Sequence, residues 1–378
     1  MKHWHEEMPF TADNSLAELI FTENSLFFDI ETTGFSAART SLYLIGCAAR
    51  KENLLIVDQF FAETPADESD VLHAFLDYLQ NFDTIITFNG IGFDIPYLTN
   101  KCQKYKIPEP FSAYEYVDIY KMISGFRFLF ALPNLKQKTV EQFIGLERED
   151  AYNGGELIDV YKACQKNPDK KLISLLKQHN YEDVIDMPKL LSVLSYVKLF
   201  EGAFNVTSIC ANESVSYDGK PCREILFSMQ NIFPVPKRVS CHYEDFHLVV
   251  DTDQTTLCVR LYTGELKYFL SDYKNYWYLP DRRKISPFPQ ALLPRFQKNE
   301  EKKLPQEPAI KKRMPFLFPS IRKYKNRHSV LCLKIKKVIL NCQKILLLPV
   351  KCRKNIVCMY CSLSGRKNCE LSFLLFII

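Results

Sequence analysis

The chain has 378 residues, of which 47% are hydrophobic and 25% are charged, a composition typical of globular proteins. No apolar run reaches the roughly 20 residues of a membrane-spanning helix, and the polar, acidic first residues lack the apolar core of a secretory signal. No membrane-spanning helix is therefore expected, and we expect a cytoplasmic protein. The cysteines before residue 281 show no paired spacing, which suits reduced thiols.

The net charge of +5 is distributed unevenly along the chain. Residues 281–378 hold 23 Lys and Arg against 5 Asp and Glu, a net charge of +18. The preceding residues hold 26 against 39, a net charge of −13. The last quarter of the chain therefore differs in kind from the rest.

Short apolar runs bounded by polar or glycine breaks predict strands over 25–31, 42–50, 53–61 and 84–89. The break at Lys51-Glu52-Asn53 predicts a hairpin between the second and third. Helical periodicity follows over 67–79, 94–105 and 136–144, with a short strand and its turn over 114–120. A long helical region covers 170–200 and is expected to bend at Pro188. Antiparallel strands followed by strand–helix alternation predict an α/β domain with a mixed sheet flanked by helices.

The pattern changes over 201–280, where a small β-meander is expected. Strand-like runs cover 246–250, 257–261 and 266–270, with turns predicted at 251–253 and at Thr263-Gly264. Tyr273 and the Tyr276-Trp277-Tyr278 run close this segment. Such aromatic side chains fit the core of a small sheet, and they could also stack nucleobases.

Residues 281–378 are irregular and basic, and they allow three interpretations. The charge fits a nucleic-acid-binding arm. Cys358 and Cys361, with Cys352 and Cys369 nearby, resemble part of a zinc site, although a single CxxC pair is common by chance. The interpretation that we favour is that this segment is not a selected protein sequence, for example the product of a reading-frame shift.

Acidic residues recur where predicted strands end and along the long helix. Asp29 and Glu31 are two residues apart at the end of a strand, so both project from one face. Asp94 stands where a strand gives way to a helix. His179 and Asp183 are four residues apart and share one helical face. If these elements pack together, four carboxylates meet at one place.

Clustered carboxylates repel one another unless cations neutralise them. Oxygen ligands indicate Mg²⁺ or Mn²⁺ in preference to zinc, and a pair of such ions supports phosphodiester hydrolysis. The ordinary pKa of histidine suits His179 to act as general base at neutral pH.

Structural roles for the same residues stay open. Asp94 could cap the following helix, and His179 could be an ordinary residue of a helix surface. Asp118 and Asp186 fit structural roles. Asn89 either orients a substrate or holds its turn.

The motifs resemble those of the DEDD 3′–5′ exonucleases of the ribonuclease H-like superfamily, in particular the YprB-type domain. The matching segments, covering about 25–200, are Phe28-Asp29-Ile30-Glu31-Thr32-Thr33-Gly34, Thr87-Phe88-Asn89-Gly90, Phe93-Asp94-Ile95-Pro96-Tyr97-Leu98 and His179-Asn180-Tyr181-Glu182-Asp183-Val184. The connecting segments 146–150 and 155–158, followed by Tyr161, also resemble that domain. The resemblance implies metal ligands at Asp29, Glu31, Asp94 and Asp183. One departure is the spacing from His179 to Asp183, since the subclass that carries His normally keeps five residues between them.

These observations predict a segment 1–20, a ribonuclease H-like domain over 21–200, a small β-rich domain over 201–280 and a basic tail over 281–378. The expected activity is two-metal 3′–5′ exonuclease hydrolysis of DNA or RNA, acting on single-stranded 3′ ends. Candidate catalytic residues are Asp29, Glu31, Asp94, His179 and Asp183, and candidate substrate-binding residues are Thr33, Gly34 and Asn89. Candidate phosphate contacts are Lys101, Lys104, Lys106 and Arg127. The alternative is a non-catalytic nucleic-acid-binding or scaffold protein that keeps the fold.

Overall fold

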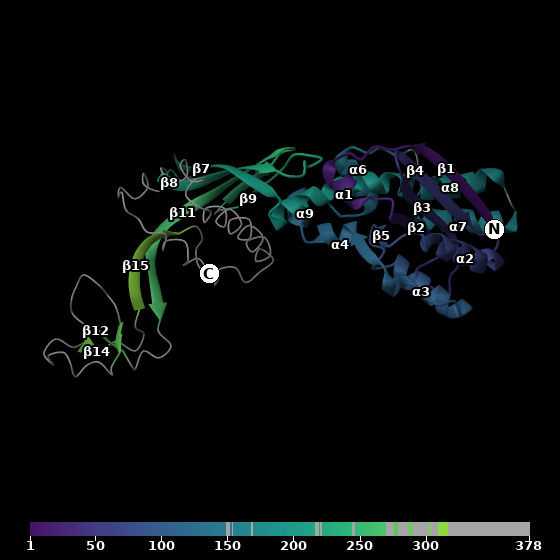
Figure 1. Ribbon diagram of the computed structural model, residues 1–378, viewed down its shortest axis with the longest axis horizontal. Coiled ribbons are helices and arrows are strands. Elements are labelled where there is room, and N and C mark those ends of the chain that lie inside the picture. Colours follow the sequence, from purple (N-terminus) through teal and green to yellow (C-terminus); the bar gives the residue numbers. More distant parts are fainter. Residues whose placement is uncertain are drawn as a thin grey trace.

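The computed structural model describes most of the chain up to residue 269, and four short strands beyond it. The described residues are 1–148, 152, 154–167, 169–215, 219, 221–243, 246–269, 276–278, 287–289, 302–303 and 309–316. The proposed zinc cysteines and most of the basic tail lie outside them. Figure 1 shows an elongated molecule with a helix-rich α/β part at one end and an antiparallel sheet beside it.

The first part is built on a six-stranded mixed sheet of order β1-β4-β3-β2-β5-β6. The strand β2 is central, antiparallel to β3 and parallel to β5. The strands are β1 Lys2–Pro9, β2 Ser25–Thr32, β3 Leu42–Lys51, β4 Leu54–Phe61, β5 Thr84–Thr87 and β6 Glu115–Asp118. The predicted hairpin at Lys51-Glu52-Asn53 is confirmed, with Glu52 at a positive φ of 54°. The strand β1, which was not predicted, pairs with β4 at the edge of the sheet.

Helices cover both faces of this sheet, so the predicted α/β domain with a mixed sheet flanked by helices is confirmed. The helices are α1 Ser15–Ile20, α2 Glu68–Leu79, α3 Asp94–Tyr105, α4 Ile119–Ser124, α5 Arg127–Phe130, α6 Gln137–Ile144, α7 Gly154–Lys166, α8 Lys170–Leu190 and α9 Leu194–Glu201, with single 3₁₀ turns at Pro65–Asp67, Phe111–Ala113 and Leu191–Val193. Strand side chains alternate between two cores. Leu26 and Phe28 pack with α2, α3 and α7, whereas Phe27 packs with α4, α6, α8 and α9.

The predicted long helix over 170–200 is interrupted three residues after Pro188. The helix α8 continues through Pro188 to Leu190, and the 3₁₀ turn at 191–193 separates it from α9. Proline removes a backbone donor and crowds the preceding turn, so it does not account for a 3₁₀ turn that follows it.

The second part is an antiparallel sheet of order β7-β8-β11-β10-β9, with β15 pairing the far end of β11. Its strands are β7 Phe204–Val215, β8 Pro221–Asn231, β9 Val239–Tyr243, β10 Phe246–Val250, β11 Gln254–Phe269 and β15 Ala309–Phe316. The turn at 251–253 is confirmed, but the turn predicted at Thr263-Gly264 is wrong, because β11 runs through both residues. A third small sheet joins β12 Tyr276–Tyr278, β13 Pro287–Pro289 and β14 Lys302–Lys303. The side chains of the aromatic run that forms β12 lie outside the described ones.

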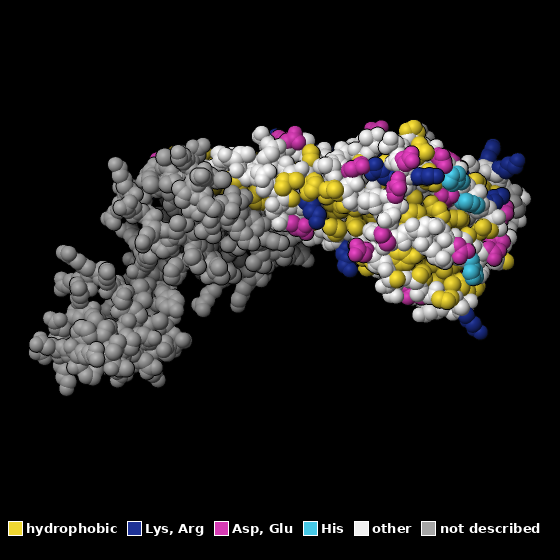
Figure 2. Space-filling view, in the orientation of Figure 1, with side chains coloured by type: hydrophobic (Ala, Val, Ile, Leu, Met, Phe, Trp, Pro, Cys, Tyr) yellow, Lys and Arg dark blue, Asp and Glu magenta, His cyan; other side chains and the backbone are white. Residues whose placement is uncertain are grey.

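Among the described residues, no helix combines the length and the apolarity needed to cross a bilayer. Figure 2 shows that histidine side chains gather beside acidic ones at the end of the molecule where the chain begins.

Candidate metal centre

Two candidate acidic ligands come from the central strand β2. The side chains of Asp29 and Glu31 lie on the same face of β2 as that of Phe27, and α8 packs across this face. Glu31 is buried, and the hydroxyl of Tyr43 donates to its Oε2 at 3.4 Å. The strand therefore presents both carboxylates to the helix that carries the third motif.

The helix α8 supplies His179 and Asp183 one turn apart. His179 Nε2 lies 3.4 Å from Glu31 Oε1 and 3.4 Å from Asp183 Oδ2. The candidate ligand atoms of these three residues all lie within 4.8 Å of one another. His179 is buried, so the interpretation of this residue as a helix-surface histidine is wrong.

Asp94 reaches the same place from the other side of β2. It is the first residue of α3, and its Oδ1 accepts the backbone N–H of Ile30 at 3.3 Å. The proposed N-cap role is wrong, because Phe93 occupies the cap position. We call Asp29, Glu31, Asp94, Asp183 and His179 the carboxylate nest.

The electrostatics of the nest follow from its burial and crowding. Burial, reinforced by the negative charges of Asp183, Asp94 and Glu31, raises the pKa of Asp29 well above its ordinary value, while Arg148 opposes the rise. Burial also raises the pKa of Asp94 to about 7, against the effect of the backbone N–H groups that it accepts. Such crowding of acidic groups favours a bound cation.

The donor set fits a divalent cation. The cluster at Glu31, His179 and Asp183 offers two carboxylate oxygens and one imidazole nitrogen, and Asp29 and Asp94 add oxygens beside it. Predominantly oxygen ligands suit Mg²⁺ or Mn²⁺.

Two amide side chains, Asn180 and Gln59, form a hydrogen-bonded network that holds Asp29. Asn180 Nδ2 donates to Asp29 Oδ2 at 3.4 Å, and Gln59 Nε2 donates to Asn180 Oδ1 at 2.9 Å. Asn180 lies so close to β3 that a Cβ on Gly46 would stand 2.1 Å from its Oδ1. These residues were not predicted, although a glutamine inside the apolar run 54–61 indicates a buried polar contact.

The three candidate substrate-binding residues hold the loops around the nest. Thr33 exchanges two hydrogen bonds with Ser41 at 2.8 Å, donating its backbone N–H and accepting at Oγ1. The carbonyl of Gly34 accepts from the hydroxyls of Thr32 and Thr40. Asn89 has a positive φ of 69°. These contacts support the turn-holding role, and a substrate role stays a prediction.

Asp118 fixes the loop that leads to Asp94, as its predicted structural role requires. Its Oδ1 accepts the backbone N–H groups of Asn89 at 3.0 Å and Lys121 at 2.9 Å, and its Oδ2 accepts that of Ile91 at 3.1 Å. Asp118 thereby caps α4 and ties it to the loop.

The predicted phosphate contact at Lys101 is wrong, whereas the one at Lys104, whose side chain is half exposed, stays a prediction. Lys101 is buried, with Nζ 2.6 Å from Glu68 Oε1 and 2.5 Å from the carbonyl oxygen of Thr40. Lys104 Nζ lies 2.7 Å from Glu68 Oε2. Both ammonium groups neutralise the buried Glu68 on α2, so they serve the packing of α3 on α2.

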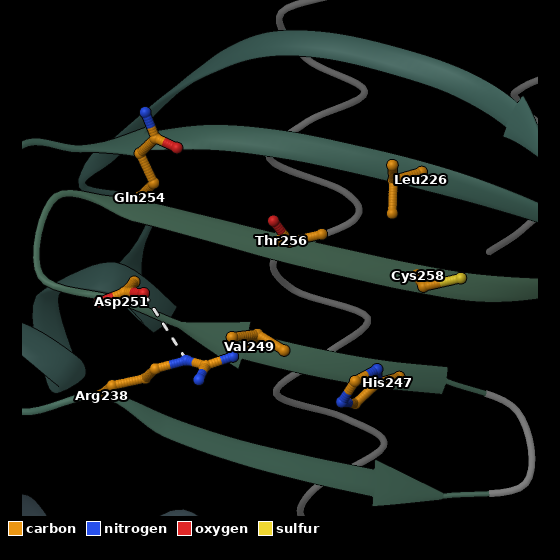
Figure 3. A pocket seen from close by; sticks show the side chains of 8 residues that line it. All are labelled: Leu226, Arg238, His247, Val249, Asp251, Gln254, Thr256 and Cys258. Carbon is orange, nitrogen blue, oxygen red and sulfur yellow. Dashed lines mark ion pairs between the residues drawn. The ribbon is translucent and has the colours of Figure 1, made fainter.

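The second sheet carries a pocket of about 370 Å³ away from the nest (Figure 3). Its lining side chains come from β8 to β11 and their connections, and Arg238 and Asp251 form an ion pair of 3.6 Å at one end. No residue of the nest lines it.

Residues 26–195 match the family model RNase_H_2, described as the RNase_H superfamily. This match confirms the predicted ribonuclease H-like resemblance for that segment and supports a nuclease. No curated protein matches the chain.

Several solved structures resemble the chain at low identity. The family B DNA polymerase of the archaeon Pyrobaculum calidifontis is 19% identical over 46% of this chain and 25% of its own, with a TM-score of 0.39. E. coli Exonuclease I is 14% identical in complexes with a dT13 and with a dA16 oligonucleotide, with TM-scores of 0.28. These two matches cover 55% and 56% of this chain and 55% of the exonuclease. The chain thus spans between a quarter and little more than half of these proteins.

Proposed function

We propose that this protein is a metal-dependent 3′–5′ exonuclease that hydrolyses phosphodiester bonds at single-stranded 3′ ends of DNA or RNA. The observation that carries the proposal is the cluster of Glu31, His179 and Asp183, whose candidate ligand atoms lie within 4.8 Å of one another. Asp29 and Asp94 lie near enough for their charges to act on one another and on Asp183. The match of residues 26–195 to the RNase_H superfamily supports it. A cytoplasmic location belongs to the same proposal.

The roles of the residues follow from their placement. Asp29, Glu31, Asp94 and Asp183 would hold two Mg²⁺ or Mn²⁺ ions, whose positive charge stabilises the attacking and departing oxygens of the phosphodiester. His179 would accept the proton of the attacking water at Nε2, and the Glu31 and Asp183 carboxylates orient its ring. Because Glu31 comes from β2 and Asp183 from α8, the packing of this helix on the sheet sets the geometry of the reaction.

The alternative is a non-catalytic nucleic-acid-binding or scaffold protein. Concentrated negative charge repels phosphate, so four convergent carboxylates disfavour a pure binding role. A scaffold would also have no need of a histidine held between two of them.

The direct test is degradation of 5′-labelled single-stranded DNA and RNA with Mn²⁺ or Mg²⁺ and with EDTA. We expect a ladder that shortens from the 3′ end, and a 3′-terminal phosphorothioate should slow it. Asp29→Asn should reduce degradation to background, and His179→Gln should lower the rate by roughly 10²–10⁴-fold.

The matched control is Asp186→Asn, which removes a carboxylate from the same helix at a position paired with Lys189 outside the nest. This variant should retain activity. Absence of metal-dependent degradation by the unaltered protein, or equal degradation by Asp29→Asn, rejects the enzyme in favour of the binding protein.

A further inference from the structure

An arginine reaches into the nest from the connection between α6 and α7. Arg148 Nη1 lies 2.5 Å from Asp183 Oδ1, and only 7% of the arginine side chain is exposed. Arg148 belongs to the connecting segment that resembles the family, and the proposed chemistry leaves it without a role. It therefore places a permanent positive charge against one of the four acidic residues.

The guanidinium is anchored from behind by Glu141 on α6. Arg148 Nε lies 2.5 Å from Glu141 Oε2, and Nη2 lies 2.6 Å from Glu141 Oε1, a two-point contact that fixes the plane of the group. Glu141 is itself buried and accepts a hydrogen bond from Gln137 Nε2 at 2.9 Å. Gln137 also donates to the backbone carbonyl of Asp183 at 2.9 Å, which ties α6 to α8.

This arrangement supplies the nest with a positive charge from the chain itself. Four carboxylates in a buried space need compensation, and arginine stays charged at every physiological pH. The charge of Arg148 also acts on Asp29, beyond the carboxylate that it touches. A divalent ion held by the acidic residues of the nest would attract the same Asp183 carboxylate.

We propose that Arg148 is an internal counter-cation of the nest, which competes with a divalent ion for Asp183. The inference rests on the proposed function in one respect, namely that the nest binds a divalent ion. Arg148 is a positioning residue here: it holds Asp183 in the metal-free protein and yields that carboxylate when an ion binds. The two-point contact with Glu141 keeps the guanidinium beside the nest throughout.

The test is Mn²⁺ binding by the full-length protein, measured by calorimetry without nucleic acid. Arg148→Gln alone would leave Glu141 buried without its partner, so the main variant is Glu141→Gln/Arg148→Gln, which removes both charges together. We expect it to bind Mn²⁺ about tenfold more tightly. An adjacent guanidinium lowers the proton affinity of a carboxylate by about tenfold or more, and it opposes a bound metal ion in the same direction. Its melting temperature should also rise more on addition of Mn²⁺.

Arg238→Gln is the control, since this exposed arginine pairs with Asp251 on the second sheet, outside the nest. It should bind Mn²⁺ as the unaltered protein does. The proposal is overturned if the double variant keeps its far-UV circular dichroism and binds Mn²⁺ equally well or more weakly. Arg148 is then only a structural link between helices. If the unaltered protein binds Mn²⁺ no better than Asp94→Asn, the nest is not an ion site and both proposals fail. Binding without degradation rejects only the exonuclease.

Discussion

At the scale of single residues, Asp58 shows how a buried charge secures the edge of the first sheet. Its Oδ1 lies 2.7 Å from His3 Nε2 and 2.9 Å from His5 Nδ1, both on β1. The hydrogen bond to Asp58 raises the pKa of His5 above its ordinary value of 6.5, although burial opposes the rise. The contact between β1 and β4 is therefore sensitive to pH.

The sign of this dependence follows from linkage. Because the pKa of His5 is higher in the folded protein, its stabilising contribution is complete below about pH 6.5 and is lost as the pH rises through the folded value. We expect His5→Gln to lower the free energy of unfolding more at pH 5.5 than at pH 9, measured with urea.

His73→Gln is the matched control, because His73 contacts Ser69 on its own helix. The difference from the unaltered protein should be alike at both pH values. If the loss of unfolding free energy caused by His5→Gln grows with pH, the contact with Asp58 does not stabilise the protonated histidine.

The positions of the acidic residues could be predicted because each is tied to a local signal. Asp29 follows an apolar strand, Asp94 opens a helix, and Asp183 stands one turn after His179. Arg148 could not be assigned in the same way, because its contact with Asp183 spans 35 positions and depends on how α6 packs beside α8. The phosphate contact predicted for Lys101 was wrong for the same reason. A lysine near an acidic site suggests a phosphate contact, and the sequence does not show that Lys101 is buried against Glu68.

At the scale of elements, the approach of α8 to β3 decides where His179 and Asp183 stand. The helix crosses the sheet at Gly46, where the missing side chain makes room for Asn180. Asn180 then reaches Asp29, so the distance between the helix and the two acidic residues of β2 depends on this one contact.

We expect Gly46→Ala to reduce the free energy of unfolding by about 1–3 kcal/mol, the usual cost of excess volume in a packed interior. The methyl group cannot fit unless the Asn180 amide or α8 moves. Either movement disturbs the contact of Asn180 with Asp29, so Mn²⁺ affinity should fall as well. Denaturant unfolding and calorimetry measure the two effects.

Asn180→Ala provides the check, since it removes the amide that the new methyl group would strike. In that background Gly46→Ala should cost less than half as much. The same cost in both backgrounds would show that Gly46 matters for another reason.

Elements with a strong local pattern were predictable, whereas the edge strand β1 and the full length of β11 were not. The strands β2 to β5 carry apolar runs with clear breaks, whereas β1 alternates Trp4, Glu6 and Met8 with more exposed residues and looks like a polar segment. In β11, Thr263-Gly264 is a turn-forming pair in isolation, but pairing with β15 keeps it extended. Strand pairing over a distance overrides local propensity in such cases.

At the scale of the whole molecule, the two sheets share one hydrophobic core. The cluster that contains Phe27 and Met187 continues through Phe200 and Phe204 to Phe227 and Leu248 in the second sheet. The hydroxyl of Tyr196 on α9 also accepts the backbone N–H of Lys237 at 3.2 Å. The second sheet is therefore part of what stabilises the first.

We expect a chain that ends at Gly202 to melt at least about 10 °C below the full-length protein, because the apolar face of α9 loses its cover. A chain that ends at Phe269 keeps the shared core and is the matched comparison. Differential scanning calorimetry measures both. Equal melting temperatures for the chains ending at 202 and 269 would show that the sheets fold independently.

Asp118 has a consequence for anyone who maps this protein by random substitution. Both of its oxygens are committed to backbone amides, and these amides hold the loop in front of Asp94. In a survey scored by activity alone, loss of this scaffold carboxylate should mimic loss of an ion ligand. More positions will therefore be needed for activity than take part in the reaction. The abundance of each variant protein must be measured alongside its activity to separate the two groups.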